Sequence, residues 1–202
     1  MQIIEADDTR MIDLPGVGPC PRPVDIDERV TGFTTLKSLR IYRFQPDVTI
    51  EGESEGDEVY VAPIGGSVDM EIVGQHPLLA DLSAASGNSA LYMPPEHAYR
   101  LTPRTGTLVA YARAAAVGRV ATQVVAMRGG SDAEKLAFVL ADLDDESELG
   151  TDNGKERLIH VVAGKAFLGG QTVSASQTIA LRNGENGSVR AIGQTSILMV
   201  SA

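Results

Sequence analysis

The sequence contains no tryptophan and one cysteine, and aromatic residues make up only 4% of its 202 residues. A chain with so few aromatic side chains lacks the stacking platforms on which proteins bind single-stranded nucleic acid. The lone cysteine, Cys20, excludes an intrachain disulfide and any cysteine-rich zinc site. It lies in a loop rich in proline and glycine, with no base nearby in the sequence, which favours an inert thiol over a nucleophile.

Basic residues and long apolar runs are also scarce. Lysine and arginine number 17 against 27 aspartates and glutamates, which gives a net charge of −10. That balance argues against a nucleic acid or an anionic membrane surface as a partner. No apolar run approaches the roughly 20 residues that span a bilayer, and the start of the chain does not resemble a secretory signal. We therefore expect a cytoplasmic protein that binds neither nucleic acid nor membrane.

What the chain does contain is a β pattern. Residues 1–32 read as an N-terminal arm, with a strand at 2–4 and an extended, proline-rich loop at 15–23. From residue 33 onward, short strands alternate with turn signals about every eight to twelve residues, which is typical of a sandwich or barrel. The stretch 136–143 follows a possible helix start at 131–135, and we favour a strand preceded by a turn. The sequence thus predicts an all-β fold.

The central stretch of the pattern covers residues 51–72. An acidic loop leads into a strand at 58–62, the sequence Pro-Ile-Gly-Gly at 63–66 predicts a turn, and a second strand follows at 67–72. We interpret this stretch as a β-hairpin that forms a pocket.

The same order of strands recurs in the second half of the chain. An offset of 99 positions aligns residues 58–65 with 157–164, and an offset of 89 aligns 89–113 with 178–202. Identities are few, so chance agreement of two β patterns remains an alternative to duplication. We expect two tandem units, at residues 33–118 and 119–202, the second one degenerate.

These residues carry a family resemblance. Glu58 with Gly65 seven positions later, followed by the run Tyr-Met-Pro-Pro-Glu-His-Ala-Tyr at 92–99, resembles the two signature motifs of the cupin superfamily. The resemblance implies two cupin-type jelly-roll barrels, a bicupin. Residues 90–101 and 107–114 are most similar to the group of 5-deoxyglucuronate isomerases and pectin-catabolic uronate ketol-isomerases, which implies a sugar acid as ligand.

Cupins that bind a metal ion use a His-x-His pair, the motif glutamate and a later histidine. This chain has no histidine at the pair's positions, and Tyr99 replaces the later one. The remaining candidate set for a divalent metal ion is Glu51, Glu53, Glu58 and His97. Our main expectation is that no metal cofactor is present.

The second unit matches the residue pattern of a metal-binding cupin less well than the first. Under the offset of 99, Arg157 takes the place of the motif glutamate. His160 has the wrong strand parity for the lumen, and we expect it to be packed or to lie at the interface between the units.

Without a metal, the first barrel is predicted to bind a small polar metabolite, such as a sugar acid. Alternative functions are a sugar isomerase or epimerase that moves a proton between Glu58 and His97, and a scaffold without a ligand. We also expect a homodimer. The candidate ligand-binding side chains are Glu58, Tyr60, His97, Tyr99, Arg40 and Arg43.

Overall fold

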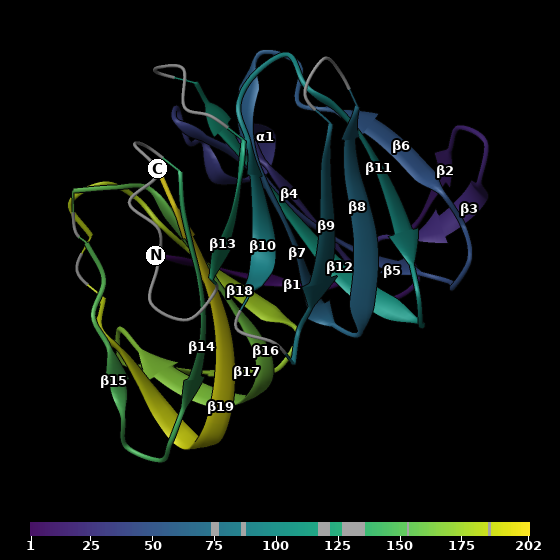
Figure 1. Cartoon of the computed structure of the whole chain (residues 1–202). Helices are drawn as coiled ribbons and strands as arrows, with labels where there is room; N and C mark the ends of the chain where they lie inside the picture. The colour runs from purple at the N-terminus through teal and green to yellow at the C-terminus, as the bar shows by residue number, and fades with distance from the viewer. Residues whose placement is uncertain (74–76, 86–87, 117–121, 127–135, 153, 186) are drawn as a thin grey trace.

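Two β-barrels follow one another along the chain and pack side by side (Figure 1). This computed structural model describes all residues except 74–76, 86–87, 117–121, 127–135, 153 and 186. Over these residues no helix has the length and apolar character needed to cross a membrane. The elements are β1 (Gln2–Glu5), β2 (Met11–Leu14), β3 (Gly18–Pro21), β4 (Val24–Asp27), α1 (Glu28–Thr31), β5 (Leu36–Phe44), β6 (Ile50–Glu53), β7 (Asp57–Gly65), β8 (Ser67–Val73), β9 (Leu78–Ser83), β10 (Asn88–Met93), β11 (Ala98–Pro103), β12 (Thr107–Ala115), β13 (Gln123–Ala126), β14 (Ala137–Leu143), β15 (Glu148–Leu149), β16 (Arg157–Leu168), β17 (Gln171–Ser174), β18 (Gln177–Leu181) and β19 (Val189–Ser201).

The first barrel is formed by two antiparallel sheets that face each other. A six-stranded sheet has the order β13-β10-β7-β12-β5-β4, and a four-stranded sheet has the order β6-β11-β8-β9. Alternate residues of the two sheets point inward and fill the lumen, among them Val61, Leu91, Met70 and Leu101. The lumen is therefore an apolar core over most of its length.

The second barrel is formed by one strongly curved sheet of the order β1-β18-β16-β19-β14, with β15 and β17 attached. Its two longest strands, β16 and β19, carry register shifts near Ala163 and bend around a separate apolar core. The sequence pattern predicts separate strands at 156–162 and 166–168 and at 187–192 and 196–201, but each pair is one continuous strand.

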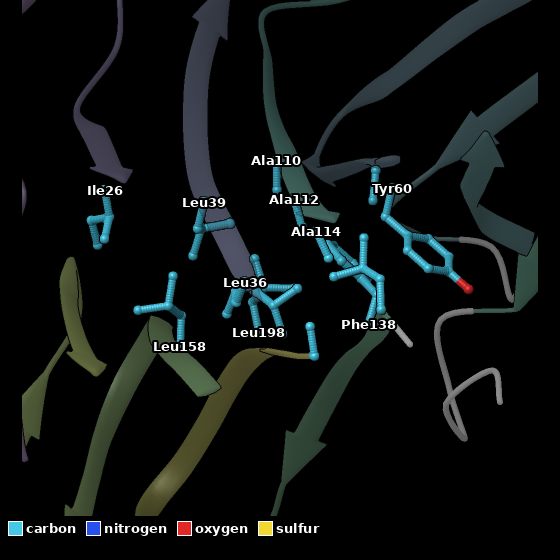
Figure 2. Packing of buried hydrophobic residues seen from close by; sticks show 14 of the residues in the cluster. Ile26, Leu36, Leu39, Tyr60, Ala110, Ala112, Ala114, Phe138, Leu158 and Leu198 are labelled. Atoms are coloured by element: carbon cyan, nitrogen blue, oxygen red, sulfur yellow. The ribbon is translucent and has the colours of Figure 1, made fainter. Parts of the chain in front are cut away.

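The broad face between the barrels holds another apolar cluster, part of which is drawn in Figure 2. The small side chains of Ala110, Ala112 and Ala114 on β12 let the second barrel approach closely, and Leu198 lies opposite. Tyr60 stacks on Phe138, with 5.6 Å between the ring centroids. Strand β7 is thus buried on both faces, which explains why it reads as a nearly continuous apolar run.

The internal repeat exists, but its register differs by one residue from the predicted one. In the first barrel, Val61 pairs with Leu91 and Tyr111. In the second, Ile159 pairs with Ile179 and Met199. The equivalent positions are therefore 98 and 88 residues apart, not 99 and 89. Because side chains alternate between the faces of a strand, this slip exchanges the inner and outer face of every aligned residue.

The predicted hairpin at 51–72 is wrong. Strand β7 pairs with β10 and β12, whereas β8 pairs with β9 and β11 in the opposite sheet. Gly66 makes the corner between the two sheets with a φ of 81°, and a Cβ atom there would lie 2.7 Å from the Thr107 hydroxyl. The corner brings the chain from one wall of the barrel to the other.

Other predictions agree with the structure. Residues 137–143 form a strand, as expected, and the helix start considered at 131–135 lies outside the described residues. The N-terminal arm joins both barrels, because β1 pairs with β18 and β4 pairs with β5. The proline-rich loop contributes one strand of the small β2-β3 hairpin.

Candidate functional site

Glu58 and Tyr60 do not face the lumen of the first barrel, contrary to the sequence prediction. Val59 and Val61 point inward, so Glu58 and Tyr60 point toward the second barrel. Glu58 is fully buried, and its Oε2 accepts a hydrogen bond of 3.3 Å from the backbone N–H of Leu136. Both residues therefore belong to the contact between the barrels.

His97 lies in the turn before β11, where it is half-buried. Its Nδ1 is 2.8 Å from the Pro95 carbonyl oxygen, and its backbone N–H donates to the Ser54 hydroxyl at 2.9 Å. Glu58 faces the neighbouring barrel, so the proposed proton transfer between Glu58 and His97 has no common pocket. Local hydrogen bonds account for the position of His97.

The candidate metal ligands are not assembled into a site. Glu51 is exposed and forms an ion pair with Arg100, with 3.0 Å between Oε1 and Nε. Glu53 is also exposed, and Glu58 points to the other barrel. In the described part of the chain, no three His, Cys, Asp or Glu side chains come together as metal ligands. The donor set predicted for a divalent ion is therefore absent from this arrangement.

A cavity of about 80 Å³ opens at one end of the first lumen. Strands β5 and β12 form one wall, and β6 and β11 form the other. Two of the predicted ligand-binding residues, Arg40 and Tyr99, line it. Arg43 does not, because it is exposed on the opposite face of β5 and pairs with Asp8 at 3.2 Å. The complete lining is Leu14, Ser38, Arg40, Tyr42, Phe44, Ile50, Glu51, Tyr99, Tyr111 and Arg113.

Two buried tyrosines form the inner part of this cavity. Tyr99 and Tyr111 are each 7% exposed, and their ring centroids are 6.1 Å apart. Burial raises the pKa of Tyr99 to about 12 and raises the pKa of Tyr111 as well. The hydroxyls of Tyr99 and Tyr111 lie near each other, and the buried Tyr111 hydroxyl makes no hydrogen bond of ordinary geometry with the described residues. A buried hydroxyl that makes no hydrogen bond lowers the stability of the folded protein.

A glycine fixes the position of Tyr99. Gly52 on β6 pairs directly with Tyr99 on β11, and a Cβ atom at Gly52 would overlap the hydroxyl and ring carbons of Tyr99. The tyrosine ring therefore occupies the space that any other residue's side chain would take. This close approach explains a glycine in the interior of a strand.

Sequence reasoning missed Ser38, Tyr42, Tyr111 and Arg113. The signal that could have found the last two is the alternation in β12. Val109, Tyr111 and Arg113 share one face of this strand, whereas three alanines share the other. Small residues on one face indicate close packing against another layer, and the larger, polar face then lines the lumen.

In the second barrel, an arginine side chain occupies part of the lumen. Arg157 is fully buried on the lumen face of β16, and its guanidinium donates to the Thr151 hydroxyl at 2.7 Å and to the Glu185 carbonyl oxygen. His160 lies on the other face of β16 from Ile159 and is 2.9 Å from the Thr178 hydroxyl, which confirms that it is packed. Burial lowers the pKa of His160 to about 4.

Cys20 is buried at the edge of the first lumen. Its burial raises the pKa of the thiol, so little thiolate is present at neutral pH. This agrees with the interpretation of Cys20 as an inert thiol.

No protein-family model and no curated protein sequence matches this chain. Solved structures do match over 99% of it. An IolB-like protein from Salmonella typhimurium is 10% identical with a TM-score of 0.74 over 92% of its own chain, and the protein Ylba from Escherichia coli is 11% identical with a TM-score of 0.75 over 90%. Oxalate decarboxylase from Bacillus subtilis, described with Mn(II) centres, is 10% identical with a TM-score of 0.75 over 76%. At such identities the likeness shows the fold alone, and it confirms the expected fold of two tandem cupin-type barrels.

Proposed function

We propose that this protein binds a small polar metabolite in the cavity of the first barrel. The observation that carries the proposal is the Tyr111 hydroxyl, which is buried at the cavity without a hydrogen-bond partner among the described residues. Buried polar groups in folded proteins nearly always have a partner, so the Tyr111 hydroxyl offers a hydrogen-bonding group to a molecule in the cavity. The side chains of Arg40, Arg113 and Tyr99 complete a polar lining.

A sugar acid is one member of this ligand class, because a guanidinium binds a carboxylate well and tyrosine hydroxyls bind hydroxyl groups. A uronate isomerase or epimerase remains a second candidate through the motif resemblance alone. The Glu58–His97 pair proposed for its proton transfer is not brought together, so any such activity needs another acid and base. The cavity residues that remain for this role are Glu51 and the tyrosines.

Thermal unfolding in the presence of small polar compounds tests the proposal. A ligand at 100 times its Kd adds about 2.7 kcal/mol of stability, which raises the Tm of a chain of this size by roughly 5 to 10 °C. We expect such a rise with carboxylates, hydroxy acids or polyols, and a smaller rise in the Tyr111→Phe variant. Absence of any shift at millimolar concentrations across all three classes would favour a scaffold without a ligand.

A further inference from the structure

We infer that the group recognised by the first-barrel cavity is the carboxylate of a short monocarboxylic acid with one or two carbon atoms. This inference rests on the proposed function and narrows its ligand class. Three separate features of the cavity lead to it: the balance of charge around Arg40, the kind of hydrogen-bonding groups that line it, and its size.

The charge around Arg40, one of the two arginines in the cavity lining, is positive. The guanidinium of Arg40 lies 3.3 Å from Asp25, but the same carboxylate also pairs with Arg10 at 2.8 Å and with Arg22 at 2.7 Å. One carboxylate therefore faces three guanidinium groups and cannot neutralise them.

The positive charge is centred on Arg40, because the other arginine of the lining, Arg113, is paired with Glu55 at 3.2 Å and with Asp57 at 3.6 Å. Arg40 is therefore the side chain that attracts an anion into the cavity.

The positive charge extends to the cavity lining. Arg22 lies over the Tyr42 ring, 5.6 Å from its centroid, and donates to the Tyr42 hydroxyl at 3.3 Å. Arg40 lies directly opposite Tyr111 in the ladder between β5 and β12. A carboxylate that accepts a hydrogen bond from Tyr111 would thus be close to the guanidinium of Arg40.

The lining also donates more hydrogen bonds than it accepts. Arginine has only donors, and the hydroxyl of Tyr42 already accepts from Arg22, which leaves its own proton free to donate. The hydroxyls of Tyr99 and Tyr111 carry their protons at neutral pH, as tyrosine hydroxyls ordinarily do, and burial raises the pKa of both further. The acceptor-only side chain in the lining, Glu51, is bound to Arg100 at the rim. An acceptor-rich ligand matches this set.

The size of the cavity limits the rest of the ligand. A cavity of about 150 Å³ in an engineered protein holds benzene, which has six carbon atoms. The present cavity measures about 80 Å³, roughly half of that volume. It therefore encloses about three or four non-hydrogen atoms, which is the size of formate or acetate, and a sugar ring would remain outside.

Isothermal titration calorimetry of the full chain with acetate, glycolate, acetamide and ethylene glycol tests the inference. Acetate and acetamide have nearly the same shape but differ in charge. We expect one site for acetate and glycolate, and at least tenfold weaker binding of acetamide and ethylene glycol. Glucuronate, which is too large for the cavity, should bind at least tenfold more weakly than acetate.

Two variants with a matched control locate the binding. Arg40→Gln and Tyr111→Phe should each weaken acetate binding about tenfold or more, because a hydrogen bond to a charged group is lost. Arg43→Gln removes an arginine from the same strand on its outer face and should bind acetate like the unaltered protein. Circular dichroism and the Tm show that each variant is folded before it is titrated.

The outcomes separate this inference from the proposed function. If acetamide or ethylene glycol binds as well as acetate and Tyr111→Phe weakens that binding, the cavity binds small molecules but the carboxylate inference is wrong. Glucuronate binding tighter than acetate also overturns it. If none of the five compounds binds, both this inference and the proposed site lose their support.

Discussion

Glu58 and Glu156 occupy equivalent positions in the two barrels, and each accepts a backbone hydrogen bond from a buried leucine of the other barrel. Glu58 Oε2 accepts from Leu136 at 3.3 Å, and Glu156 Oε2 accepts from Leu36 at 2.9 Å. The equivalence follows from the ladders, since Glu58 pairs with Ala114 and Glu156 pairs with Ala202. The glutamate at the cupin motif position therefore links the barrels here.

The two glutamates differ in how many donors they satisfy. Glu156 also accepts from the backbone N–H groups of Thr34 and Thr35, both at 2.7 Å, and from the Thr34 hydroxyl at 3.1 Å. Glu58 Oε1, by contrast, has no hydrogen-bond partner among the described residues. A glutamine can replace one acceptor oxygen but not two, because its NH₂ group only donates.

We therefore predict that Glu156→Gln lowers the free energy of unfolding by about 2 kcal/mol or more, and that Glu58→Gln lowers it by less than about 1 kcal/mol. Urea denaturation of both variants at neutral pH measures the two values. Equal losses in both variants would show that the hydrogen bonds of Glu156 carry no more stability than the single one of Glu58.

The buried His160 makes stability depend on pH. Its pKa in the folded chain is about 4, against an ordinary value of 6.5. Between these values the unfolded chain binds a proton that the folded chain does not, so stability falls as the pH decreases from about 6.5 to 4. A difference of this size corresponds to about 3 kcal/mol.

Replacing His160 with glutamine should flatten the stability curve over that pH range, while a hydrogen bond to Thr178 remains possible. Urea denaturation at several pH values measures the curve for the unaltered protein and for His160→Gln. His97→Gln, at the barrel rim, is the matched control. A curve for His160→Gln that runs parallel to that of the unaltered protein would show that His160 is not responsible.

Gly52 is predicted to be essential for the shape of the cavity. Gly52→Ala places a methyl group on the ring of Tyr99, and we expect a loss of about 1 to 3 kcal/mol in stability together with weaker ligand binding. Gly56→Ala is the matched control, because a Cβ atom there meets no atom within 4 Å, and its effect should stay within about 0.5 kcal/mol. Equal Tm values for the two variants would contradict the close approach.

Much of the fold could be predicted because short strands, turn signals and the duplicated order are local properties of the sequence. Which face of each strand points into the lumen could not be predicted, because a shift of one residue exchanges the two faces. An offset of 98 aligns Glu58 with Glu156 and Val61 with Ile159, but the predicted offset of 99 aligned Glu58 with Arg157. Glu58 and Tyr60 were assigned to the lumen because Glu58 matches the motif glutamate of metal-binding cupins, and the offset of 99 hid the equivalence of Glu58 and Glu156.

Only part of the candidate site could be predicted from the sequence. Tyr99 was predicted from its position in the second motif, and Arg40 was predicted together with Arg43 from the strand before the motif glutamate. Tyr99 and Arg40 line the cavity, whereas Arg43 does not. Tyr111 could not be recognised without knowing that β12 packs between β5 and β7, which is a long-range pairing. The apolar cluster between the barrels buries a second face of the six-stranded sheet, and alternation alone does not reveal which face is the lumen.

The central claim is that ligand binding depends on Tyr111 and not on Glu58, the residue at the motif position. The most direct test is the rise in Tm caused by acetate in the unaltered protein, in Tyr111→Phe and in Glu58→Gln. We predict that Glu58→Gln keeps the full rise and that Tyr111→Phe loses most of it. A rise that disappears in Glu58→Gln and persists in Tyr111→Phe would contradict this account.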